Sequence, residues 1–106
     1  MTNDPAVTMK TRLRGDLRDA MRARADTETR TLRSLIAALD NAEAPPASGA
    51  VGEVQRLLLS EAEVRHVVER EAEQHEDAAR EFDRLGVADR ADDLRKAATI
   101  ARRYLD

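Results

Sequence analysis

Four basic residues at four-residue intervals form the first pattern in this sequence that suggests a chemical role. They are Lys10, Arg14, Arg18 and Arg22. On a helix they would share one side, where like charges repel by roughly 0.2–0.5 kcal/mol per pair. The segment from Met9 to Ala25 holds six basic and two acidic residues, so this side is a candidate for binding phosphates, including those of RNA. The alternative is a solvated face that an acidic helix elsewhere in the fold partly neutralises.

An acidic segment from Glu61 to Arg84 makes the charge distribution uneven. It contains nine acidic and four basic residues. The acidic and basic helices could neutralise each other inside the fold, or the asymmetry could steer a partner protein or a second copy of the chain. We favour internal neutralisation, because charge runs most often form solvated or balanced surfaces.

Three polar residues of the acidic segment, Glu71, Gln74 and His75, are candidates for a polar seam between helices. Glu71 and His75 fall on an alternating four-three spacing where an apolar residue is expected. A carboxylate and a histidine one turn apart could act as an acid–base pair or as two metal ligands. Either site needs further groups and a pocket, so a hydrogen-bonded polar layer is the favoured interpretation.

A second acid–histidine pair, Glu63 and His66, has the Glu-x-x-His spacing of di-iron bundles. Those sites need the motif twice and two further carboxylates, and Glu63 is also explained as part of a helix cap. The chain has no cysteine, and neither a Gly-rich phosphate loop nor a Ser-His-Asp set stands out. We therefore predict no catalytic residue, no metal and no cofactor.

Length and composition indicate one all-α, water-soluble domain. The 106 residues include one Phe, one Tyr and no Trp, and a core built on Ala, Leu and Val suits close-packed helices. Charged residues make up 37% of the chain, yet the net charge is only -3, so general nucleic-acid affinity is not implied. No apolar run approaches the roughly 20 residues that cross a bilayer, and a signal-peptide pattern is lacking. A cytoplasmic protein is expected.

Hydrophobic periodicity predicts two helices in the first half of the chain. The expected elements are a disordered tail over 1–7, a helix from Thr8 to Arg24, a second helix from the caps Asp26 and Thr27 to Glu43, and mostly loop over 44–59.

Two more helices are predicted in the second half. Ser60 and Glu63 form a capping box, flanked by Leu59 and Val64 as a hydrophobic staple. This helix should continue to Leu85 and end at Gly86, followed by a last helix from Ala88 to Leu105. Short joints pair the four helices as two antiparallel hairpins. The side chains expected to be buried between the hairpins are Leu35, Ile36, Leu39, Val68 and Phe82.

Two segments resemble the N-terminal helical part of the YqeY (GatB/YqeY) family. The first, DLRDAMRARADTETRTLRSLIAALDNAE, carries Asp16, Leu17, Ala20, Met21, Leu32, Arg33, Ala38, Leu39, Asn41, Ala42 and Glu43 at the matching positions. The second, LSEAEVRHVVEREAEQHEDAAREFDRLGVADRADDLRKAATIARRYL, carries Glu71, Gln74, Phe82, Gly86, Leu94, Tyr104 and Leu105. Together they span nearly the whole chain.

The resemblance implies two helical hairpins and association with tRNA-dependent amidotransferases, for which the inherited label is glutamine-dependent carbon-nitrogen ligase activity. It does not imply catalysis by this chain, because free-standing family members lack the amidase and kinase-like parts. Members usually continue into a smaller C-terminal lobe, whereas this sequence stops at Asp106. Their third helix also tends to be basic where this sequence reads REAEQHE over 70–76.

These observations lead to two functional hypotheses. The first is a non-catalytic binding module of tRNA metabolism, in which the basic side of the first helix contacts backbone phosphates and an amidotransferase-like partner supplies the chemistry. The second is a helical protein–protein interaction module with no nucleic-acid role. The candidate partners are tRNA, an amidotransferase-like protein or a second copy of the chain, with no membrane and no small-molecule cofactor.

Overall fold

A computed structural model describes residues 4–45 and 56–106 of the chain. The helices in these parts are α1 (Pro5–Arg22), α2 (Asp26–Glu43), α3 (Glu61–Arg84), α4 (Ala88–Arg102) and the short 3-10 helix η1 (Arg103–Leu105). No strand occurs in either described range, which confirms the predicted all-α class. Most of the predicted loop over 44–59 lies outside the described residues.

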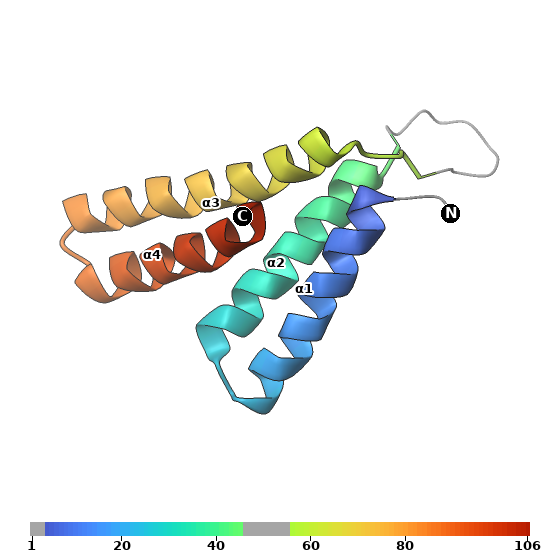
Figure 1. Cartoon of the computed structure of the whole chain (residues 1–106). Helices are drawn as coiled ribbons and strands as arrows, with labels where there is room; N and C mark the ends of the chain where they lie inside the picture. The colour runs from blue at the N-terminus through green and yellow to red at the C-terminus, as the bar shows by residue number, and fades with distance from the viewer. Residues whose placement is uncertain (1–3, 46–55) are drawn as a thin grey trace.

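The helices pack as two antiparallel hairpins that diverge like the arms of a V (Figure 1). One arm is made of α1 and α2, and the other of α3 and α4. Contacts between the arms are made mainly by α2, which touches both α3 and α4. Because the arms separate away from the vertex, the outer half of each projects into solvent.

The first helix begins earlier than its apolar periodicity predicts. Asp4 is its N-cap, and the Asp4 carboxylate accepts hydrogen bonds from the backbone N–H groups of Ala6 (3.0 Å) and Val7 (3.2 Å). Pro5 takes the first helical position, where its fixed φ suits a helix and its missing N–H costs nothing. The expected tail over 1–7 and the expected start at Thr8 are therefore wrong from Asp4 onward, and Ala6 is fully buried.

The joint between α1 and α2 differs from prediction at its caps. Arg24 takes a positive φ of 54° there, and Ala25 is the N-cap of α2 without a side-chain hydrogen bond. Asp26 and Thr27, the predicted caps, lie inside the first turn instead. Asp26 still stabilises the helix start, because its negative charge lies at the positive end of the helix dipole.

Both ends of α3 follow local sequence signals. Ser60 and Glu63 form the predicted capping box, with hydrogen bonds of 2.9 and 3.1 Å between each side chain and the other residue's backbone N–H. At the other end α3 stops at Arg84, and Gly86 has the positive φ of 76° that favours glycine. The Val87 N–H then bonds the Phe82 carbonyl at 2.9 Å, which closes the turn into α4.

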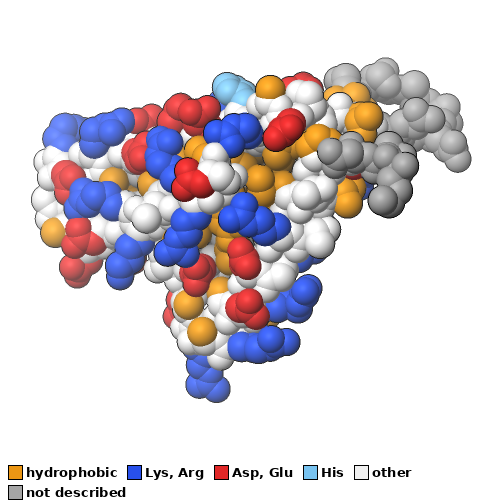
Figure 2. Space-filling model, in the orientation of Figure 1, with side chains coloured by type: hydrophobic (Ala, Val, Ile, Leu, Met, Phe, Trp, Pro, Cys, Tyr) orange, Lys and Arg blue, Asp and Glu red, His pale blue; other side chains and the backbone are white. Residues whose placement is uncertain are grey.

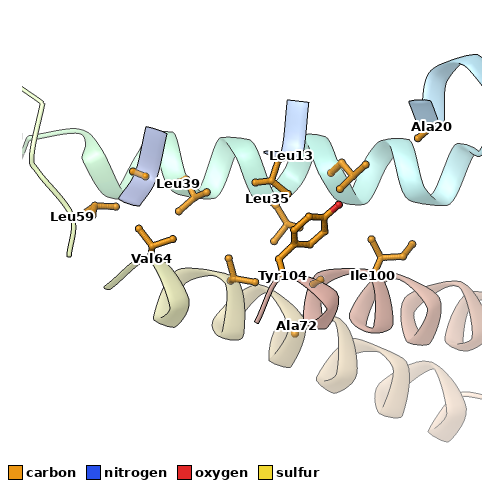
Figure 3. Packing of buried hydrophobic residues seen from close by; sticks show 13 residues of the cluster. Leu13, Ala20, Leu35, Leu39, Leu59, Val64, Ala72, Ile100 and Tyr104 are labelled. Carbon is orange, nitrogen blue, oxygen red and sulfur yellow. The ribbon is translucent and has the colours of Figure 1, made fainter. Parts of the chain in front are cut away.

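The core is a single cluster in which α2 packs between α1 and the second hairpin (Figure 3). Its largest fully buried side chains are Leu13, Leu32, Leu35, Leu39 and Val68. The predicted burial of Leu35, Leu39 and Val68 is confirmed, and Ile36 packs against the cluster while half-buried. Figure 3 also shows Tyr104 pointing into this core from the chain's last turn.

Phe82 was expected in the core and is not there. It is half-buried on the outer part of the α3–α4 arm, where the guanidinium of Arg90 lies 5.2 Å from its ring centroid. The reason is the divergence of the arms: α2 no longer covers α3 at this distance from the vertex. Tyr104 is the aromatic side chain that fills the core instead.

Truncation of Leu35 and of Phe82 should therefore have unequal effects. Leu35→Ala should lower the free energy of unfolding by about 2–5 kcal/mol, because it leaves a cavity in the shared core. Phe82→Ala should cost clearly less, since the ring is already partly hydrated. Urea unfolding of both variants measures the difference, and a larger loss for Phe82→Ala would contradict this assignment of the core.

Candidate functional site

Lys10, the first residue of the predicted basic stripe, is buried and internally paired. It is 3% exposed, and its Nζ donates to Asp40 Oδ1 at 2.9 Å and to Glu43 Oε1. Burial alone would lower the pKa of Lys10, but the hydrogen bonds to Glu43 and Asp40 outweigh it and the pKa is raised. The inclusion of Lys10 among the phosphate-binding candidates is therefore wrong, because its charge is held inside the fold.

The carboxylate that holds Lys10 is the centre of an ion cluster at the vertex end of α2. Glu43 is 2% exposed and also forms an ion pair with Arg56, whose Nη2 lies 3.1 Å from Glu43 Oε2. The backbone of the same region is fixed by the Leu57 N–H, which donates to the Glu43 carbonyl at 2.7 Å. Sequence reasoning missed this cluster because it joins residues far apart in the chain.

The remaining arginines of the stripe lie on the surface of α1. Arg14 and Arg18 are exposed, and within the described ranges neither forms an ion pair with a carboxylate. Arg22 is exposed as well, but its Nη1 lies 3.5 Å from Asp19 one turn earlier. Such an exposed pair holds its partners weakly. Figure 2 shows Lys and Arg side chains along the outer edge and tip of the α1–α2 arm.

Several acidic residues of α3 have ion-pair partners within their own hairpin. Within helix α3, Asp77 pairs with Arg80 and Glu81 pairs with Arg84. Across to α4, the Glu76 carboxylate accepts two hydrogen bonds from Arg102, at 2.8 and 2.7 Å. No ion pair between α1 and α3 occurs among residues 4–45 and 56–106. The expected neutralisation of the basic stripe by the acidic helix is therefore wrong, because that helix draws its counter-charges from its own hairpin.

The predicted polar seam forms in part. Glu71 faces α2, where Ser34 Oγ donates to Glu71 Oε2 at 3.1 Å. His75 lies one turn further along α3, with its Nε2 3.9 Å from the same oxygen, beyond hydrogen-bond length. Gln74 is exposed and lies outside the layer. The seam therefore consists of Ser34, Glu71 and His75, and Ser34 is the member that the sequence did not single out.

Tyr104 fastens the last turn of the chain to α1. Its hydroxyl donates to Asp16 Oδ2 at 2.5 Å, and the Arg12 guanidinium lies 4.6 Å from its ring centroid. Desolvation, followed by the hydrogen bond to Asp16, raises the pKa of Tyr104 well above its usual range. Through these contacts with Tyr104, Arg12 and Asp16 help to hold the two hairpins together.

A groove of about 820 Å³ lies between the first turn of α2 and α4. Two of its basic residues already have carboxylate partners: Arg95 pairs with Asp83 and Asp92, and Arg103 pairs with Glu28 at 2.9 Å. The third, Lys96, is exposed and forms no ion pair within the described residues. The groove therefore offers one free positive charge, whereas the surface of α1 offers Arg14 and Arg18. Among the described residues, Arg14 and Arg18 therefore form the stronger anion-binding candidate.

The geometry defines a class of protein: an all-α module of two diverging hairpins whose candidate site is an exposed surface. A family model described as Yqey-like protein matches residues 10–106. The chain belongs to this YqeY-like family. Comparison with curated proteins found no match, and neither did comparison with solved structures. No helix in the described ranges is long and apolar enough to cross a membrane.

Removal of the Lys10 charge should destabilise the fold strongly. Lys10→Met leaves the buried Glu43 carboxylate with less compensation, so the free energy of unfolding should fall by about 3–5 kcal/mol. Arg14→Met, a matched change of an exposed residue on the same helix, should shift it by no more than about 0.5 kcal/mol. The double variant Lys10→Met, Glu43→Leu should recover part of the loss. Equal effects of the two single variants in urea unfolding would refute a structural role for Lys10.

Alkaline pH should destabilise the protein through Tyr104. The unfolded chain releases the Tyr104 proton near the ordinary pKa of 10.0, whereas the folded protein retains it. The stabilising contribution is therefore complete below about pH 10 and is lost as the pH rises further. Tyr104→Phe should flatten the fall in unfolding free energy above about pH 10, measured by urea unfolding over a pH series. An unchanged slope in the variant would contradict this assignment.

Proposed function

We propose that this YqeY-like chain is a non-catalytic module that binds RNA through its phosphate backbone. The observation that carries the proposal is the exposure of Arg14 and Arg18 without carboxylate partners in the described part of the chain. An arginine that is free of internal ion pairs can contact a phosphate without first breaking a pair. Several arginines of the α3–α4 arm, by contrast, are held in ion pairs, as Arg80, Arg84 and Arg102 are.

The expected mode of binding is weak and tolerant of sequence. Guanidinium groups on one side of a helix contact phosphates in succession, which fixes the position of an RNA strand but does not read its bases. Lys10 is buried in an ion pair with Glu43, and Arg22 is paired with Asp19 at the surface. Two or three arginine–phosphate contacts therefore remain. Each contact releases counterions, so the affinity should fall steeply with salt.

Membership of the YqeY-like family supports a setting in tRNA metabolism. In this setting the chain acts beside an amidotransferase-like partner that performs the transamidation chemistry. The chain itself supplies the arginine surface and no catalytic residue. The inherited ligase label then describes the assembly and not the module.

Reversal of charge on α1 should remove RNA binding and leave the fold intact. The double variant Arg14→Glu, Arg18→Glu should keep the parent's helicity, because both side chains are exposed and outside the core. Its affinity for a mixed-sequence RNA oligonucleotide at low salt should fall more than tenfold. Fluorescence anisotropy measures the affinity, and circular dichroism checks the helicity.

The α3–α4 arm offers a matched control. Arg80 and Arg84 are also exposed, lie four residues apart on one helix, and are paired with Asp77 and Glu81. Arg80→Glu, Arg84→Glu changes the net charge by the same amount, so it separates a local site from general electrostatics. Equal loss of affinity in both double variants, or no RNA binding by the parent at low salt, would overturn the proposal.

A second candidate function is a protein-interaction module, and it is favoured by an exposed apolar group at the vertex. Leu58 is 72% exposed, and Leu57 and Val7 are each 45% exposed. Exposed leucines side by side are typical of contact surfaces. Capture of a protein from native cytosol that survives RNase treatment and is lost in Leu58→Asp would favour this function over RNA binding.

A further inference from the structure

Helix α2 adds an arginine to the exposed basic side of α1. Arg33 is exposed, and its Nη2 lies 3.7 Å from the Sδ of Met21 on α1. Met21 is 50% exposed, so this contact lies at the surface. No carboxylate of the described ranges forms an ion pair with Arg33. Arg33 is therefore exposed and free of ion pairs, as are the phosphate-binding candidates Arg14 and Arg18.

Two side-chain contacts define the line along which α1 and α2 meet. At the vertex end Lys10 contacts Asp40, and towards the outer end Met21 contacts Arg33. The two α1 residues are separated by about 16 Å of helix rise. Arg14 and Arg18 fall between them in the chain, and Arg18 is a surface neighbour of Met21 because residues three apart adjoin on a helix. Arg18 and Arg33 thus flank Met21 from opposite helices.

The charge along this line changes from one end to the other. At the vertex end, Lys10 is neutralised by Asp40 and Glu43. Further along, Arg14, Arg18 and Arg33 lack such partners within the described residues, while Arg22 has only an exposed pair with Asp19. Exposed, unpaired arginines therefore lie on both helices along their line of contact, and not on α1 alone.

We propose that Arg33 is a further RNA-contacting residue, and that the RNA backbone lies along the α1–α2 contact line from Arg14 towards the joint. This inference rests on the proposed function and specifies its surface. A strand placed over α1 alone would meet Arg14, Arg18 and Arg22, the last of which is engaged by Asp19. A strand placed over the α1–α2 contact line meets Arg14, Arg18 and Arg33 on both sides of Met21.

The chain offers a matched control for Arg33 on the same helix. Arg30 is one turn earlier on α2, is exposed, and has no ion pair within the described ranges. It lines a groove of about 620 Å³ with His75 of α3 and Leu94 of α4. Arg30 therefore lies on the side of α2 that faces the second hairpin. Substitution of Arg30 or Arg33 by Ala removes the same charge from the same helix at different faces.

The test measures the affinity of the full chain and its variants for a mixed-sequence, single-stranded RNA oligonucleotide over a series of salt concentrations. Each phosphate contact on a single strand contributes about 0.7 to the slope of log affinity against log salt. Arg33→Ala should reduce that slope by about 0.7 and lower the affinity about fivefold near 0.1 M salt. Arg30→Ala should change neither. Circular dichroism checks that both variants keep the parent's helicity.

The outcomes separate this inference from the proposed function. If Arg33→Ala binds like the parent while Arg14→Glu, Arg18→Glu loses binding, the placement of RNA along the α1–α2 contact line is wrong and RNA binding by α1 stands. If Arg30→Ala and Arg33→Ala weaken binding equally, diffuse charge is responsible and this placement is again wrong. If the parent binds no RNA, or binds a polyglutamate peptide in preference to RNA, both proposals fall.

Discussion

Burial of the apolar side of α2 is the interaction on which the rest of this structure depends. Leu32, Leu35 and Leu39 of this helix are fully buried, and they contact one hairpin partner and the opposing hairpin at once. Because one helix serves both contacts, the two hairpins meet mainly along α2. The outer part of the α3–α4 arm and the outward sides of α1 and α2 remain uncovered, and this leaves Phe82 half-buried and the arginines of the α1–α2 arm in solvent.

Electrostatic pairing decides which of the exposed charges are available to a ligand. The acidic helix α3 and its neighbour α4 satisfy many of their charges locally, as in the two hydrogen bonds from Arg102 to Glu76. At the vertex, Glu43 forms ion pairs with both Lys10 and Arg56. A chain with a net charge of only -3 still presents exposed arginines without ion pairs in its described residues, among them Arg14, Arg18 and Arg33 of the α1–α2 arm. The proposed RNA surface depends on this uneven pairing and not on overall charge.

The candidate site was only partly predictable from sequence. Helical spacing placed Arg14 and Arg18 on one side of a helix, and the structure leaves them exposed. The same spacing included Lys10, because periodicity reports which residues share a side but not what lies opposite. Arg33 was recognised only as a position of family resemblance, since its contact with Met21 joins residues on two helices. Ser34 in the polar seam was missed for the same reason.

The sequence by itself determined the features that depend on neighbours along the chain. Amphipathic periodicity fixed the number and type of the helices, the Ser60–Glu63 capping box fixed the start of α3, and Gly86 fixed the turn after it. Only the tertiary structure decided where the hairpins separate, which aromatic side chain fills the core, and which charges cancel. Those outcomes depend on contacts between residues tens of positions apart, such as Lys10 with Glu43 and Tyr104 with Asp16. Local periodicity carries no information about such pairs, because each is set by the packing of one helix against another.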